Sequence, residues 1–112
     1  MGSPEEFDFL TETRLEYYLE AIIHDEQPLI PPLTGIECIL TDIAAGKPTD
    51  WPPFTRLEHY LAYISGADAV LYDPITRIEY YLAKIAGMDV NAPPPVTRIE
   101  MLLAQWERKL HD

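Results

Sequence analysis

The sequence predicts an all-α fold: an array of five short capped helices joined by extended, proline-rich connectors. Three observations predict it. A 21-residue repeat runs without insertion or deletion, every unit opens with a helix-capping pattern, and every unit carries an apolar stripe with helical spacing. The units start near residues 13, 34, 55, 76 and 97, so the array spans 13–112, and residues 1–12 are expected to cap its first unit.

The start of each unit is a threonine followed three residues later by a glutamate, which is the pattern of a capping box. The threonine hydroxyl accepts from a backbone N–H of the first turn, and the glutamate accepts from the threonine N–H. The predicted pairs are Thr13–Glu16, Thr34–Glu37, Thr55–Glu58, Thr76–Glu79 and Thr97–Glu100. Four of these threonines follow an apolar residue, which we expect to form a hydrophobic staple with the first helical turn. These residues are Leu33, Phe54, Ile75 and Val96.

The body of each unit has the periodicity of an amphipathic helix about three turns long. In the fourth unit the stripe is Ile78, Tyr81, Leu82 and Ile85, which is the spacing i, i+3, i+4, i+7. Glycines stand where three of the helices should end, because a residue beyond the last turn often takes a left-handed conformation. They are Gly46, Gly66 and Gly87.

The connectors hold all but one of the 11 prolines, so we expect extended segments that lie against the helices. A single unit cannot fold alone. Ordering it costs on the order of 30 kcal/mol, whereas burying its four stripe side chains returns roughly 6–12 kcal/mol. Two arrangements could supply the rest: the helices stack within the chain as a solenoid or bundle, or they pack against other chains in an oligomer.

Arginine recurs at the first helical position, where the helix dipole disfavours a positive charge. The four are Arg14, Arg56, Arg77 and Arg98. A feature repeated against its local cost indicates a partner, which we expect to be a carboxylate on an adjacent unit or chain. The candidates are Asp50, Asp68, Asp73 and Asp89. The alternative is a solvated arginine whose stem covers apolar surface.

Aromatic side chains cluster on the same helices and are enriched in protein interfaces generally. Together with the four arginines, they form the candidate interface: Tyr17, Tyr60, Tyr63, Tyr80, Trp51 and Trp106. The alternative is a helix core that includes tyrosine and tryptophan.

Composition excludes several classes of function. The net charge of −11 argues against nucleic-acid binding and against anionic membrane surfaces. We see no secretory signal and no apolar run long enough to span a bilayer. The single cysteine, Cys38, rules out an internal disulfide and a cysteine metal cluster.

Catalytic signatures are weak, so we expect no enzyme, no cofactor and no metal site. His24, His59 and His111 fall at unrelated repeat positions without metal-ligand spacing. Neither a glycine-rich phosphate loop nor a nucleophile elbow is present.

A resemblance to known proteins is carried by the unit T-R-I-E-Y-Y-L-A-K-I-A-G and the connector M-D-V-N-A-P-P-P-V. This unit resembles a short repeat in virion proteins of tailed phages and prophages of Gram-positive hosts, including head-fibre and tail-associated proteins. The resemblance implies an accessory subunit of the virion, assembled in the host cytoplasm. Its partners would be capsid or tail proteins and other copies of itself. The alternative from composition is a small acidic intracellular module that blocks a basic partner surface.

Overall fold

The computed structural model describes residues 13–111, and within that range it contains five α-helices and no strand. The helices are α2 (Arg14–Ile23), α3 (Gly35–Ala44), α4 (Arg56–Ser65), α5 (Arg77–Ile85) and α6 (Arg98–His111). The predicted all-helical class and the helical nature of every unit are therefore confirmed. The expected cap segment, residues 1–12, lies outside the described residues.

Each helix begins one residue after the threonine of its unit. In all five units the threonine hydroxyl accepts from the backbone N–H of the glutamate three residues on, at 3.1–3.2 Å. This bond satisfies a donor that has no partner inside the helix. The helix start is thus set within four residues of sequence.

The helix ends use a left-handed residue, as the glycine positions predict. Gly46, Gly66 and Gly87 have φ values of 74°, 104° and 100°. The first unit has no glycine at this place, and Asp25 takes the left-handed conformation there with φ of 57°. Aspartate tolerates this region better than most residues with a Cβ.

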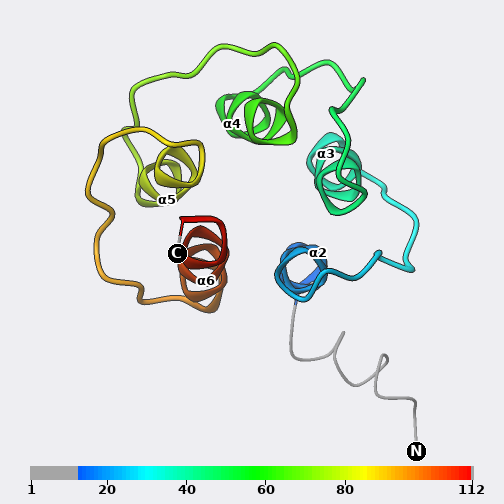
Figure 1. The fold of residues 1–112 in the computed structure, drawn as a ribbon, viewed down its shortest axis with the longest axis horizontal. Helices are drawn as coiled ribbons and strands as arrows, with labels where there is room; N and C mark the ends of the chain where they lie inside the picture. The colour runs from blue at the N-terminus through cyan, green and yellow to red at the C-terminus, as the bar shows by residue number, and fades with distance from the viewer. Residues whose placement is uncertain (1–12, 112) are drawn as a thin grey trace, which may run out of the picture.

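The five helices stand side by side in a ring, with the connectors on the outside (Figure 1). Each helix packs against the next along the chain, and α2 also packs against α6, so the ring is closed within one chain. The first turns of neighbouring helices meet, since Arg14 of α2 binds Glu37 of α3. The helices are therefore parallel, and each connector returns the chain to the same end of the ring.

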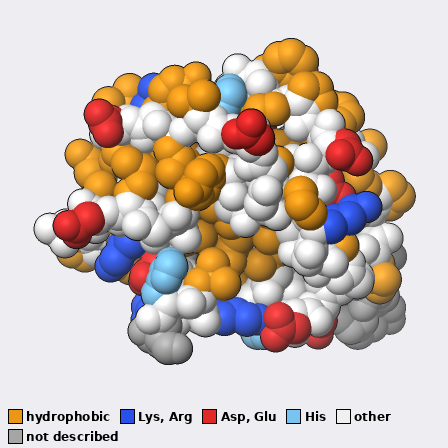
Figure 2. Space-filling view, turned by 45° about the horizontal axis from the view of Figure 1, so that its top comes forward, with side chains coloured by type: hydrophobic (Ala, Val, Ile, Leu, Met, Phe, Trp, Pro, Cys, Tyr) orange, Lys and Arg blue, Asp and Glu red, His pale blue; other side chains and the backbone are white. Residues whose placement is uncertain are grey.

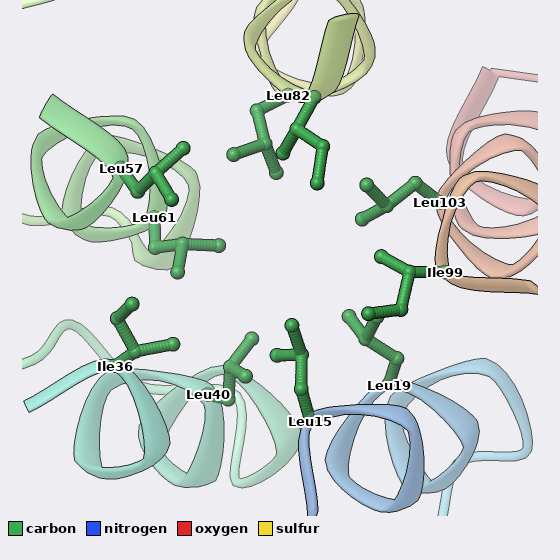
Figure 3. Close-up of a pocket in the computed structure, with 10 residues that line it drawn as sticks. Leu15, Leu19, Ile36, Leu40, Leu57, Leu61, Leu82, Ile99 and Leu103 are labelled. Carbon is green, nitrogen blue, oxygen red and sulfur yellow. The ribbon is translucent and has the colours of Figure 1, made fainter. Parts of the chain in front are cut away.

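Three of the four stripe positions form layers inside the ring, each with one residue per helix. The first layer is Leu15, Ile36, Leu57, Ile78 and Ile99, and the second is Leu19, Leu40, Leu61, Leu82 and Leu103. The third layer is Ile22, Ile43, Ile64, Ile85 and Trp106. Figure 3 shows side chains of the first two layers pointing from all five helices toward the ring axis.

The expected hydrophobic staples are wrong. The four apolar residues before the threonines, hereafter the N-face residues, are 72–78% exposed. Their backbone N–H groups instead donate to the capping glutamate of their own unit, at 2.7–2.9 Å. This bond fixes the backbone while the side chain points to solvent. Figure 2 shows hydrophobic side chains over much of one side of the molecule, with separate acidic, basic and histidine side chains among them.

Candidate functional site

The junctions between helices are built by the repeated arginines. Arg14 donates from Nε and Nη2 to the two carboxylate oxygens of Glu37, at 2.9 Å each. Two further junctions repeat this paired bond, at 2.9–3.0 Å, with Arg56 on Glu79 and Arg77 on Glu100. Such two-point guanidinium–carboxylate bonds fix orientation as well as distance. Each of these three arginines therefore links the first turn of its helix to the capping glutamate of the next.

A third bond from the same guanidinium holds the connector. Nη2 donates to the backbone carbonyl of Pro31, Asp73 or Pro94, at 3.0, 2.7 and 2.8 Å respectively. Arg56 also lies over the ring of Tyr72, with its guanidinium carbon 4.8 Å from the ring centre. One side chain thus joins a helix, the connector that leaves it, and the next helix.

The expected aspartate partners of the arginines are wrong. The partner is the capping glutamate of the next unit, and Asp73 takes part only through its backbone carbonyl. The partners are 23 residues apart, which is the 21-residue repeat plus the offset of two positions from the arginine to the glutamate of a unit. That constant offset was readable in the sequence. It was missed because the glutamates already had a local capping role.

The five capping glutamates are buried, and three of them, Glu37, Glu79 and Glu100, are paired with arginines of the preceding unit. Hydrogen bonds from Arg14 and Arg56 lower the pKa of Glu37 and Glu79, and burial opposes this effect. The Arg77 hydrogen bond is the largest influence on Glu100, whose pKa falls to about 2. The N-face backbone N–H groups contribute in the same direction. The carboxylates of Glu37, Glu79 and Glu100 therefore stay charged and bonded near neutral pH.

Tyrosines at one repeat position hold the connectors from the inside. The hydroxyl of Tyr18 donates to the carbonyl of Ile30 at 2.7 Å, and that of Tyr60 to Tyr72 at 2.5 Å. Tyr81 makes the same bond to Pro93. Burial raises the pKa of all three phenols. The sequence analysis placed Tyr81 in the stripe but did not predict this bond, because the path of the connector is not visible in the sequence.

Two aromatic interface candidates are corrected by their burial. Tyr60 is 0% exposed and Trp106 is 2% exposed, since both side chains fill the space between helices of this chain. Trp51 and Tyr63 are exposed, at 41% and 43%. Tyr17 and Tyr80 are half-buried.

Tyr17 also has a role within the chain. Its hydroxyl oxygen accepts from the Leu29 N–H at 2.8 Å, so it too fastens a connector.

The junction between α3 and α4 differs, because Gly35 stands where the other units have arginine. A Cβ at this position would lie 2.4 Å from Nε1 of Trp51 and 2.7 Å from Oε2 of Glu58. The indole of Trp51 therefore occupies the space of the missing arginine, beside the glutamate that the arginine would bind. Only glycine leaves room for this arrangement.

The ring closes between the last and first helices through Arg98. Its guanidinium pairs with Glu20 and lies 3.8 Å (Nε to Oε1) from Glu16, the capping glutamate of the first unit. The first unit thus takes the place of a sixth unit.

The extra turn of α6 completes this closure. Lys109 donates to the last carbonyls of α2, at Ile22 and Ile23, and pairs with Asp25 at 2.6 Å. His111 Nε2 lies 3.1 Å from the carbonyl of Ile85 at the end of α5. The end of α6 therefore caps both neighbouring helices, a role that sequence reasoning did not assign.

Many polar side chains at the junctions bind other groups of the chain. Within residues 13–111, no three metal-ligating side chains come together. None of the five helices is both long enough and apolar enough to cross a bilayer. The arrangement fits a rigid body that presents a surface.

No family model, curated protein or solved structure matches this chain.

Proposed function

We propose that the protein is an accessory structural component of a phage virion, as a capsid decoration, head-fibre part or tail-associated spacer. It acts by protein–protein assembly, with capsid or tail proteins and with other copies of itself, and it catalyses no reaction. It assembles in the host cytoplasm and resides in the virion. The observation that carries this proposal is the set of N-face residues at one end of the ring.

The N-face residues are large, apolar and more than 70% exposed, and they occur at the same position in four consecutive units. Because the helices are parallel, all four lie at the end of the ring where the helices begin. Burying one such side chain stabilises a complex by about 1.5–3 kcal/mol. Contiguous exposed apolar surface in a folded protein commonly marks a binding site. A partner that covers this end would gain from all four residues at once.

Rigidity supports the same proposal. The N-face backbone is held by capping glutamates that are themselves bound by arginines of the preceding unit at three junctions. The apolar side chains are therefore presented at fixed spacing before any partner arrives. Such preorganisation reduces the entropy lost on binding.

The proposal is tested by replacing all four N-face residues with serine. We expect the wild-type chain to co-purify with virions at a fixed copy number per particle and the fourfold variant to be lost from them. A matched control replaces exposed apolar residues elsewhere, Leu29, Val70 and Leu110, with serine, and it should remain bound. Circular dichroism checks that both variants keep the wild-type helix content. Virions without the wild-type chain would refute the proposal.

A second candidate is an acidic module that blocks a basic partner surface inside the cell. One observation favours it: the four repeated arginines are all bound to carboxylates of this chain, so they form no basic patch against the net charge of −11. Capture of a basic host protein that is released by salt, together with absence from virions, would favour this candidate over the first.

A further inference from the structure

The end of the ring where the helices finish carries a pocket of about 150 Å³, hereafter the C-end pocket. Its apolar walls come from three helices: Ile22 of α2, Ile43 and Ala44 of α3, and Trp106 and Leu110 of α6. α6 starts at the same unit position as the others but has 14 residues, whereas α2 and α3 have 10 each. Its last turn therefore extends beyond the ends of α2 and α3 and forms one wall.

Burial shows where the C-end pocket opens. Trp106 and Ile22 are buried, so they form its floor. Leu110 is exposed at the rim, and the rim also holds the ion pair between Lys109 and Asp25, just beyond the end of α2. The mouth of the pocket therefore faces away from the ring, on the side opposite the N-face residues.

The size of the C-end pocket matches one aromatic ring. A cavity of roughly 150 Å³ with apolar walls takes a benzene molecule. The C-end pocket has the same volume and largely apolar walls, so it has room for one phenyl side chain. Phe54 is the only phenylalanine within residues 13–111, and it is an N-face residue that is 78% exposed.

Phe54 cannot reach the C-end pocket of its own chain, because the two lie at opposite ends of the ring. α4 alone, which starts two residues after Phe54, has 10 residues and is about 15 Å long. The Phe54 backbone N–H donates to Glu58 at 2.7 Å, so the side chain projects from a fixed point. A projecting ring at one end and a fitting pocket at the other can meet between two copies that point the same way.

The helix dipoles favour this orientation. A helix start carries a partial positive charge and a helix end a partial negative charge. All five helices point the same way, so the two ends of the ring differ in sign. Four of the five capping glutamates are paired with arginines and add little net charge at the helix starts. Stacking in one direction joins opposite ends, whereas a contact between two N-faces would join like ends.

The facing ends are also large enough for an interface. Helices packed about 8–10 Å apart in a ring of five, each with a radius of about 5–6 Å, cover a disc of about 450–650 Å². The connectors outside the helices add to this area (Figure 1). The sum approaches the roughly 800 Å² per partner of a standard protein interface. We therefore expect association that is specific and reversible.

We propose that copies of this chain stack head to tail, with Phe54 of one copy in the C-end pocket of the next. Such a contact does not close on itself, so the stack is open-ended. The inference rests on the proposed function, because it assigns a second copy of the chain as one partner of the N-face residues. The terminal copy of each stack keeps its N-face residues free for a capsid or tail protein.

The test measures the mass of the purified chain by analytical ultracentrifugation over a range of concentrations. Phe54→Ser removes the projecting ring, and Ala44→Phe fills the C-end pocket from within. We expect the wild-type chain to grow in mass with concentration and each variant to associate at least about tenfold more weakly. Val70→Ser, which changes an exposed apolar residue on a connector, is the matched control and should associate as the wild-type chain does.

Mixing the two variants tests the direction of stacking. Ala44→Phe keeps its Phe54, and Phe54→Ser keeps its open pocket, so an equal mixture should form one-to-one dimers and nothing larger. Association through two N-faces would instead persist in Ala44→Phe alone and give no new complex on mixing. That pattern, or a wild-type chain that stays monomeric, would overturn the proposal. Circular dichroism checks folding, and Leu110→Ser at the rim replaces Ala44→Phe if the latter does not fold.

Virion binding separates this inference from the proposed function. Ala44→Phe retains all four N-face residues, so it should still bind virions, at a lower copy number than the wild-type chain. An unchanged copy number together with a monomeric wild-type chain would reject the stacking and leave the proposed function intact. A chain that stacks in solution but is absent from virions would reject the proposed function alone.

Discussion

The α4–α5 and α3–α4 junctions each join neighbouring helices of the ring, but with different side chains at the junction. At α4–α5, Arg56 binds Glu79 and a connector carbonyl. At α3–α4 the arginine is replaced by Gly35, and the indole of Trp51 fills its place. The apolar layers continue through both junctions unchanged. The difference teaches that helix packing sets the ring, while the polar group at the junction secures the connector and the buried glutamate.

The connector at α3–α4 is secured by its own side chains instead. Thr49 is buried, its hydroxyl donates to Asp42 at 2.7 Å, and its N–H donates to Ser65 Oγ at 3.1 Å. The Trp51 N–H donates to the Thr49 hydroxyl oxygen, also at 3.1 Å. Trp51 is thus positioned by hydrogen bonds within the connector, which replace the bond that the arginine makes elsewhere.

The largest effect is expected at the arginine junction. Arg56→Met leaves the buried carboxylate of Glu79 without its two guanidinium bonds and frees the connector at Asp73. We expect the free energy of unfolding to fall by about 2–4 kcal/mol, because a buried charge loses its partner. Urea denaturation measures this loss. The double variant Arg56→Met with Glu79→Met should recover part of the lost stability. If Arg56→Met alone were as stable as wild type, the Arg56–Glu79 pair would not stabilise the junction.

A smaller loss of stability is expected when Gly35 at the α3–α4 junction is replaced by the arginine that the other units have. Gly35→Arg introduces a Cβ into space held by Trp51 and Glu58, so we expect a loss of about 1–3 kcal/mol from overpacking. Adding Trp51→Ser should restore most of this stability, because the new arginine can then reach Glu58. Thermal unfolding of the single and double variants gives the comparison. If Gly35→Arg stabilised the protein with Trp51 present, the indole would not occupy the space of the missing arginine.

The loss of stability should be smaller still at the contact between α6 and α2, which closes the ring. Lys109→Met removes the cation that caps the last carbonyls of α2, and we expect a loss of about 1 kcal/mol. Arg108→Met, at the neighbouring exposed position, is the matched control and should stay within about 0.5 kcal/mol of wild type. Chemical denaturation of both variants measures the difference. Equal losses of stability in the two variants would show that removing any positive charge near this end has the same effect, and that the bonds from Lys109 to the α2 carbonyls are not the cause.

The smallest expected effect on the free energy of unfolding is that of a change in pH near neutrality. The pKa values of Glu37, Glu79 and Glu100 are lowered in the folded state, so their stabilising contribution is complete above the unfolded pKa of about 4.5. It is lost as pH falls toward the folded values, the lowest of which is about 2 for Glu100. Urea midpoints should be flat from pH 7 to 5.5 and then fall. Arg77→Met should make the acid slope shallower, and an unchanged slope would contradict the assigned cause.

Local structure was the part that the sequence alone determined. Every helix starts after its threonine, and three helices end at a glycine with positive φ, because capping and left-handed termination involve residues within a few positions of one another. The stripe was predictable for the same reason, since helical periodicity follows from the backbone. Thr76, for example, fixes the start of α5 through its bond to the N–H of Glu79.

The tertiary structure alone decided which residues meet across units. Closure of the ring depends on each unit turning by about one fifth of a circle, a small geometric quantity that adds up over the array and has no local signature. That turn brings Arg98 to Glu16 and Glu20, buries Tyr60 and Trp106, and leaves a cavity of about 50 Å³ between the first two apolar layers. The repeat made each unit alike, and only the angle between units determined what the five build together.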